Sequence, residues 1–221
     1  MTTWPKHRPE LSPEQVDIMH SWYGYWLPLI DQKFGPVGKF NHGFALETAN
    51  PALRTLEIGV GEGKHAKMEG SDNYYGLELN PGYVQYNVRM VTADAEKGIP
   101  FKSGWFDRVL AIHVLEHLAN LPAALDEVNR VLKPNGTFTV VIPCEGGLGY
   151  TVGRNLSTRR IFERKFGKNY DWMIAYDHVN TAREVLGELK DRFKSLRTAY
   201  FPLKVPIVDA NLCIGLDLVR R

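Results

Sequence analysis

Three glycines alternate with other residues at Gly59, Gly61 and Gly63, directly after the apolar run Leu53–Ile58. Glycine permits a tight turn and lets the backbone approach a ligand closely. The free N–H groups at the start of a following helix favour a polar or anionic group. A β-strand that runs into such a loop is typical of the first turn of a nucleotide-binding α/β domain. The loop alone is weak evidence, so a nucleotide site needs support from other parts of the chain.

Short β-rich runs alternate with polar or helical stretches through the middle of the chain. These runs are Leu53–Ile58, Tyr74–Leu79, Phe106–Ile112 and Thr137–Ile142, with a weaker one around Met90–Val91. Apolar residues at helical spacing predict a helix over Asn120–Leu132, because Pro134 and Gly136 follow and end it. Alternating strands and helices are typical of a parallel sheet with helices on its faces. The sequence therefore predicts an α/β fold with a doubly wound, mostly parallel sheet.

The two ends of the chain follow other patterns. Ser12, Pro13 and Gln15 predict the start of a helix through a capping box. The glycines and proline between Gly35 and Gly43 predict a loop. Near the C-terminus we expect a helix over Thr181–Phe193, followed by the β-rich runs Leu196–Phe201 and Asn211–Val219. These two runs are expected to pair as a hairpin at one edge of the sheet.

Two acidic residues follow later strands of the predicted sheet. Glu78 ends the second run, about 20 residues after Gly59, where a doubly wound fold places a carboxylate against ribose hydroxyls. Asp94 follows the third run, where a carboxylate can accept a hydrogen bond from an adenine amino group. A solvated strand end is the alternative for Glu78, and a simple helix N-cap is the alternative for Asp94.

Two cofactors fit a glycine loop with these acids: a nicotinamide dinucleotide and S-adenosylmethionine (SAM). The dinucleotide fingerprint G-x-G-x-x-G requires a glycine where Lys64 stands, and the third glycine comes one residue early at Gly63. Glu57 also lies two residues before the first glycine. SAM carries an ammonium group and no diphosphate, so an acid beside the loop suits SAM better. The residues therefore favour SAM over NAD.

The stretch Glu57–Pro143 resembles a class I SAM-dependent methyltransferase, of the type 11 group that includes the quinone C-methyltransferases. The matching segments follow one another in the family's order: Glu57–Gly63, Glu78, Ala93–Glu96, Ile99–Phe101, Trp105–Val109, His113–Leu118 and Arg130–Gly136. Asn135 departs from the family, which usually has glycine there. The resemblance implies a Rossmann-like sheet with an antiparallel final strand, which Asn211–Val219 would supply.

The resemblance also implies roles for individual residues. Glu57, Gly59, Gly61 and Gly63 would line the methionine half of SAM. Glu78 would hold the ribose hydroxyls, and Leu79 would pack on the adenine. Asp94 would meet the adenine amino group with Ala95 beside it, and His113 would lie near the sulfonium. We expect residues 1–50 to be an N-terminal helical segment or lid. Residues 51–221 would form the SAM-binding domain, with an acceptor-site insertion near 145–180.

The catalytic candidates are the histidines His113, His178 and His117, because histidine is the usual general base for an acceptor hydroxyl. His117 has an alternative role as a cap for the helix that begins near Asn120. We expect no metal ion among the site residues.

Substrate contacts are expected from the segment around residues 153–172. Arg159 and Arg160 lie in a basic stretch that suits a phosphate or carboxylate, although a solvated helix face explains it equally well. Tyr170 and Trp172 would stack on a ring. Trp22 and its aromatic neighbours on the first helix form either packing or a lid.

These observations predict a SAM-dependent methyltransferase that acts on a small or polymer-linked, anionic acceptor, with O-methylation of a sugar-like substrate favoured. The alternatives are C-methylation of a quinone-like ring, an NAD-dependent oxidoreductase and a non-catalytic SAM-binding subunit. The net charge of +2 gives no reason to expect nucleic acid. Two distant cysteines, Cys144 and Cys213, suit a reducing compartment and core positions. No apolar stretch approaches the roughly 20 residues of a membrane span, and no secretory signal is visible. We therefore expect a cytoplasmic protein.

Overall fold

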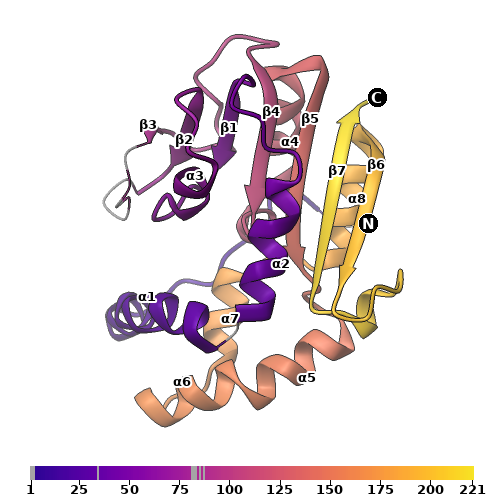
Figure 1. The fold of residues 1–221 in the computed structure, drawn as a ribbon. Coiled ribbons are helices and arrows are strands. Elements are labelled where there is room, and N and C mark those ends of the chain that lie inside the picture. Colours follow the sequence, from indigo (N-terminus) through magenta and orange to yellow (C-terminus); the bar gives the residue numbers. More distant parts are fainter. Residues whose placement is uncertain (1–2, 34, 81–83, 85, 87) are drawn as a thin grey trace.

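A seven-stranded sheet in the order β3-β2-β1-β4-β5-β7-β6 organises the chain (Figure 1). The computed structural model describes residues 3–33, 35–80, 84, 86 and 88–221. The strands are β1 (Thr55–Ile58), β2 (Tyr74–Glu78), β3 (Arg89–Thr92), β4 (Phe106–Ile112), β5 (Leu132–Pro143), β6 (Phe193–Phe201) and β7 (Cys213–Arg220). Strands β1 to β5 pair in parallel, and β7 is antiparallel to both β5 and β6. The predicted α/β class, the mostly parallel sheet and the C-terminal hairpin are therefore confirmed.

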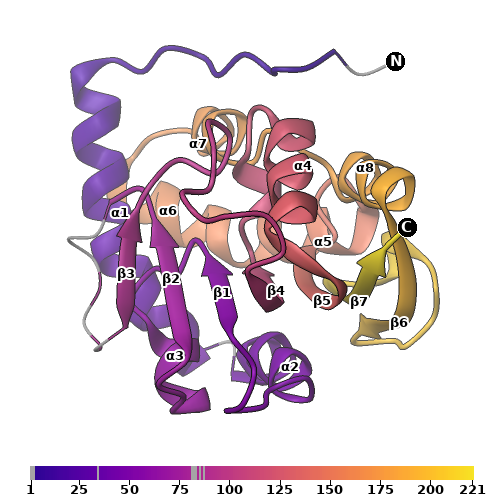
Figure 2. The same ribbon diagram turned by 90° about the horizontal axis from the view of Figure 1, so that it is seen from above.

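Helices cover both faces of this sheet (Figure 2). On one face lie α4 (Leu121–Val131) and α8 (Ala182–Arg192), and on the other lie α2 (Gly35–Leu46) and α3 (Lys64–Glu69). Helix α4 buries the apolar stripe that predicted it against the main core. Helix α8 begins at a capping box in which Thr181 and Glu184 satisfy each other's backbone N–H groups. The central strands β1 and β4 are largely buried on both faces, which explains the apolar run Val109–Ile112 of β4.

The predicted loop between Gly35 and Gly43 is wrong, because these residues belong to α2. Glycine costs a helix about 1 kcal/mol per residue relative to alanine, so local preference opposes this helix. Packing outweighs that cost. Phe44 and Ala45 are buried, and a Cβ built on Gly215 of β7 would lie 2.7 Å from the Phe44 ring. The helix therefore forms because the Phe44 ring packs directly on the backbone of β7 at Gly215, where there is no side chain.

A layer of four helices lies beyond the carboxyl ends of the parallel strands (Figure 1). We call it the helical layer: α1 (Pro13–Lys33), α5 (Leu148–Leu156), α6 (Thr158–Phe166) and α7 (Asp171–Asp177). The predicted capping box at Ser12 and Gln15 starts α1, with backbone-to-side-chain hydrogen bonds of 2.9 and 3.3 Å. The layer has its own core, made of Trp22, Trp26, Phe162, Tyr170 and Met173. It joins the N-terminal segment to the segment between β5 and α8.

Two further expectations concern the whole chain. Cys144 and Cys213 are buried and form no disulfide with each other, as predicted for core residues. Among the described residues, no helix is both long enough and apolar enough to cross a membrane.

Candidate functional site

A cavity of about 620 Å³ opens between the carboxyl ends of β1 and β4 and the helical layer. Open α/β sheets bind their ligands at this edge. One wall is the turn after β1, with Glu57, Gly59 and Gly61, and a second wall is the turn after β4, which begins at His113. The helical layer closes the cavity with aromatic side chains of α1, including Trp22. The geometry therefore joins the glycine loop and the candidate histidines in one space.

The glycine loop needs its glycines for two separate reasons. Gly59, Gly61 and Gly63 all have positive φ angles, of 66°, 53° and 84°. A Cβ built on Gly59 would lie 2.5 Å from Cγ2 of Val114, so no larger residue fits there. The N–H of Gly61 donates a hydrogen bond of 3.1 Å to Oε2 of Glu78, which ties the loop to the end of β2.

Glu57 is a buried acid beside this loop, with only 4 % of the residue exposed. Its Oε2 accepts a hydrogen bond of 2.8 Å from the hydroxyl of Tyr74. Burial raises the pKa of Glu57 to about 8, although the Tyr74 hydrogen bond opposes the shift. The cavity wall therefore contains a carboxyl that is mostly neutral at neutral pH and that a nearby cation would ionise.

The other predicted cofactor residues lie outside the cavity lining, at the ends of β2 and β3. Oε1 of Glu78 accepts hydrogen bonds from the N–H groups of Leu79 and Asn80 at 2.9 and 3.2 Å. Leu79 is 59 % exposed, which is unusual for a leucine that follows a core strand. Oδ1 of Asp94 accepts from the N–H of Glu96 at 3.0 Å, and no α-helix begins there. Ala95 is buried in the main core.

His113 follows β4 directly and adopts a positive φ of 53°, a conformation that costs a non-glycine residue energy. Its Nδ1 lies 3.3 Å from Oε1 of Glu116. Burial lowers the pKa of His113, but contacts with Cys213 and Glu116 outweigh burial and raise it to about 10. Its Nε2 is buried and has no hydrogen-bond partner among the residues that the structure describes. The strained turn thus holds the His113 imidazole at the cavity wall.

His117 is bound to the end of α7. Its Nδ1 lies 2.9 Å from the backbone oxygen of Asp177 and 3.1 Å from the Asp177 carboxylate. Burial works against the charged ring, yet Glu116 and Asp177 together raise the pKa of His117 to about 9. The Asp177 carboxylate also accepts a hydrogen bond from the hydroxyl of Tyr23 on α1. Hydrogen bonding to His117 holds the pKa of Asp177 at about 2 despite its burial.

His178 is oriented by a second carboxylate. Its Nδ1 lies 2.7 Å from Oε2 of Glu145, and Glu145 also forms an ion pair of 2.6 Å with Arg154. Burial raises the pKa of Glu145, but His178 and Arg154 overcome that effect and lower it. The rings of His117 and His178 meet edge to face, with centroids 5.0 Å apart. All three predicted catalytic histidines therefore line the same cavity.

Of the four predicted substrate residues, one lines the cavity and three do not. Tyr170 lines the cavity, whereas Trp172 packs against the core of the helical layer. Arg159 is paired with Asp171 and Glu163, outside the cavity lining, and Arg160 is exposed. The cationic side chain of this stretch that borders the cavity is Arg154.

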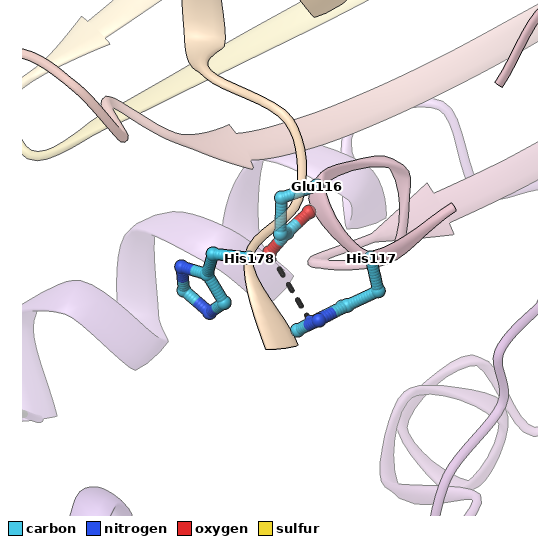
Figure 3. Close-up of side chains that lie close together, drawn as sticks. All are labelled: Glu116, His117 and His178. Atoms are coloured by element: carbon cyan, nitrogen blue, oxygen red, sulfur yellow. Dashed lines mark ion pairs between the residues drawn. The ribbon is translucent and has the colours of Figure 1, made fainter. Parts of the chain in front are cut away.

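Three acids of the site, Glu116, Asp177 and Glu145, were missed by sequence reasoning. Glu116 and Asp177 each stand directly before a candidate histidine, so adjacency was a usable signal. Glu145 follows β5 with no pattern that indicates its role. Glu116, His117 and His178 also form a group that the sequence analysis did not anticipate (Figure 3).

Comparison with known proteins gives a consistent result. Residues 56–140 match the family model described as "Methyltransferase domain". The chain is 31 % identical over 117 residues, 47 % of its length, to the "Probable phthiotriol/phenolphthiotriol dimycocerosates methyltransferase 2" of Mycobacterium ulcerans. It is 41 % identical over 56 residues, 25 % of its length, to the ubiquinone/menaquinone biosynthesis C-methyltransferase UbiE of Coxiella burnetii. These matches span 45 % and 22 % of the relatives' own lengths.

A solved structure of a SAM-dependent methyltransferase from Thermotoga maritima superposes with a TM-score of 0.61 at 18 % identity. The match covers 93 % of this chain and 99 % of that one. At this level of identity the likeness shows the fold, which agrees with the sheet order described above.

Proposed function

Because residues 56–140 make this chain a member of the class I SAM-dependent methyltransferases of the type 11 group, we propose that it transfers the methyl group of SAM to a small acceptor beneath the helical layer. One observation carries this proposal. A single cavity connects the glycine loop after β1 with the three histidines supplied by the turn after β4 and the segment after α7. A donor and an acceptor would thus meet in one space closed by aromatic side chains.

The residues present fit the proposed cofactor. SAM supplies a sulfonium-activated methyl group, and the protein supplies position and electrostatics. Glu57 would hold the ammonium group, since a buried carboxyl gains most from a cationic partner. Gly59, Gly61 and Gly63 would admit the methionine half at a loop where a Cβ on Gly59 has no room. Glu78 would hold the ribose.

The adenine would lie between the ends of β2 and β3. The exposed Leu79 supports this assignment, because its apolar side chain is free to pack against the adenine ring. Asp94 would accept a hydrogen bond from the adenine amino group. Its carboxylate already contacts the Glu96 N–H and the Lys97 ammonium, and a carboxylate can accept further hydrogen bonds. Ala95 would support that turn from the core.

O-methylation is the reaction that the acceptor side supports best. The cavity wall also contains His113, His117 and His178 with their carboxylate partners. The raised pKa of His113 and His117 makes these two rings hydrogen-bond donors to an acceptor oxygen near neutral pH, and His178 is the candidate that would take the hydroxyl proton. Arg154 also lines the cavity, and its Nε is buried without a hydrogen-bond partner in the described ranges of the chain. This supports an anionic or oxygen-rich acceptor such as a sugar derivative. We therefore propose Arg154, in preference to Arg159 and Arg160, as the cation that would contact the acceptor.

C-methylation of a quinone-like ring is the second candidate. The aromatic side chains of Trp22, Tyr150 and Tyr170 line the cavity and would sandwich a planar ring. The similarity to a quinone C-methyltransferase over 56 residues points the same way.

Methyl transfer from SAM with a labelled methyl carbon tests the proposal. The purified chain is incubated with panels of hydroxylated sugars, sugar phosphates and quinones, and NMR distinguishes new O-methyl from C-methyl signals. We expect O-methyl products from an oxygen-rich acceptor. The exposed His20→Ala variant should match the wild type, and His178→Ala should lose most of the transfer. Binding of NAD without binding of SAM would indicate an oxidoreductase. Binding of SAM without transfer to any panel member would indicate a non-catalytic subunit.

A further inference from the structure

Glu116, His117 and His178 bring together one carboxylate and two imidazoles at the cavity wall. Each offers one ligand atom, and these atoms lie within 4.8 Å of one another. Glu116 and His117 come from the short 3-10 helix Leu115–His117 after β4, and His178 directly follows α7. Figure 3 shows the Glu116 carboxylate between the two rings, with the ion pair to His117 marked. Two segments of the chain, about 60 residues apart, therefore converge on one point.

Both imidazoles are held so that the same nitrogen is left for a ligand. Nδ1 of His117 donates to Asp177, and Nδ1 of His178 donates to Glu145. A histidine that donates from Nδ1 to a carboxylate or carbonyl presents Nε2, and this arrangement orients metal-binding histidines in proteins. Nε2 of His117 lies 3.7 Å from Oε1 of Glu116, too far for a hydrogen bond. The ligand atoms of one tetrahedral Zn²⁺ lie about 3.3 Å apart, because each bond is about 2.0 to 2.1 Å long. Small side-chain rotations would therefore bring these three ligand atoms to metal-binding distances.

Glu116 provides an independent reason to expect a ligand. The residue is 2 % exposed, and its Oε2 is buried without a hydrogen-bond partner in the described part of the chain. An unsatisfied oxygen on a buried carboxylate is costly, and buried charges in proteins are paired or coordinate metals. The carboxylates of Asp177 and Glu145, which hold the two rings, add negative charge to this wall, and Arg154, His113 and His117 add positive charge. The unpartnered oxygen of Glu116 is therefore the feature that points to a further ligand.

We propose that Glu116, His117 and His178 bind one divalent transition-metal ion at the wall of the cavity. Two imidazoles and one carboxylate suit Zn²⁺, Fe²⁺ or Co²⁺, and three protein ligands leave coordination positions open. An acceptor oxygen would fill an open position, and its hydroxyl proton would become more acidic there. This inference rests on the proposed function, because it assigns the acceptor class: a molecule with a hydroxyl that can ligate the ion. His117 and His178 then act as ligands, which leaves His113 as the unligated imidazole of the cavity.

Metal titration of the full chain tests the inference without any acceptor. The chain is stripped with a chelator and titrated with CoCl₂, whose visible absorption reports coordination, and ZnCl₂ then displaces the Co²⁺. We expect one ion per chain. Glu116→Gln, His117→Ala and His178→Ala should each weaken Co²⁺ binding at least about 100-fold. The control His20→Ala replaces an exposed histidine of α1 and should bind as the wild type does.

The outcomes separate this inference from the proposed function. S-adenosylhomocysteine binding, measured on the same samples, shows whether each variant is folded, and we expect changes below about threefold. Glu116→Gln and His178→Gln are nearly isosteric and serve if an alanine variant does not fold. A wild-type chain that binds no Co²⁺, or triad variants that bind it like His20→Ala, would overturn the metal site. Co²⁺ binding without S-adenosylhomocysteine binding would uphold the metal site and reject the methyltransferase function.

Discussion

The ionisation of Glu57 should be coupled to binding of the SAM ammonium group. The pKa of Glu57 is about 8 because burial outweighs the hydrogen bond from Tyr74. The raised pKa means that Glu57 stabilises the free protein most below the ordinary glutamate pKa of about 4.5, and that this contribution is lost as the pH rises through about 8. A bound ammonium reverses the preference, since it favours the carboxylate. Ligand binding at neutral pH must therefore release a proton.

The size of this effect follows from the pKa. About nine-tenths of Glu57 is neutral one pH unit below its pKa, so binding that requires the carboxylate is about tenfold weaker there than in the fully ionised protein. Between about pH 6 and about pH 7.5 the Kd for S-adenosylhomocysteine should then fall about tenfold per pH unit. An ordinary glutamate is fully ionised over this range and gives no slope.

Isothermal titration calorimetry of S-adenosylhomocysteine measures the slope, and buffers of different ionisation enthalpy count the released protons. Glu57→Gln cannot ionise, so its Kd should be independent of pH apart from any titration of the ligand, which both proteins share. Tyr74→Phe removes the hydrogen bond that lowers the Glu57 pKa, so it should bind more weakly at neutral pH and keep the slope to higher pH. A flat wild-type profile, or a Glu57→Gln profile as steep as the wild type, would refute the reasoning.

Four further substitutions, one of them a control, probe the loop, the core and the helical layer. Gly59→Ala should destabilise the protein by about 3 kcal/mol in urea unfolding, because its φ is 66° and its Cβ would meet Val114 at 2.5 Å; an unchanged midpoint would contradict this. Arg108→Met should cost about 3–5 kcal/mol, since it leaves a buried carboxylate partner uncompensated, whereas Lys168→Met breaks an exposed pair and should cost under about 1 kcal/mol. Trp22→Ala should accelerate hydrogen exchange in the helical layer and spare the sheet, and uniform loss of protection would count against a separate core there.

The strands could be predicted because each carries its own signal. Val109–Ile112 of β4 is a continuous apolar run, which suits a strand that is buried on both faces. The hairpin of β6 and β7 was predictable from two β-rich runs that follow each other near the C-terminus. Helix α2 was not predictable from its sequence, because the residue that justifies it is Gly215 of β7, far along the chain. Local preference favoured a loop there, and tertiary packing on that strand reversed it.

The two sides of the site differ in the same way. The glycine loop is a local motif whose backbone conformation follows from residues 59–63. The acceptor wall depends on side chains that meet across the fold, such as His178 and Glu145. Single histidines were visible in the sequence, but the pairing of His117 with Asp177 and of His178 with Glu145 was not. Arg159 shows the opposite case. The basic stretch suggested that it binds substrate, but its guanidinium forms ion pairs with Asp171 and Glu163.

The proposed donor and acceptor sides of the cavity are held by different parts of the fold. The donor side is fixed by backbone geometry and by Glu78, which holds the loop through the N–H of Gly61. The acceptor side is fixed by the helical layer, because Tyr23 of α1 and Arg154 of α5 hold the carboxylates that orient His117 and His178. Neither contact involves the loop. Substitutions in the helical layer should therefore alter the proposed acceptor wall while the proposed cofactor side keeps its shape.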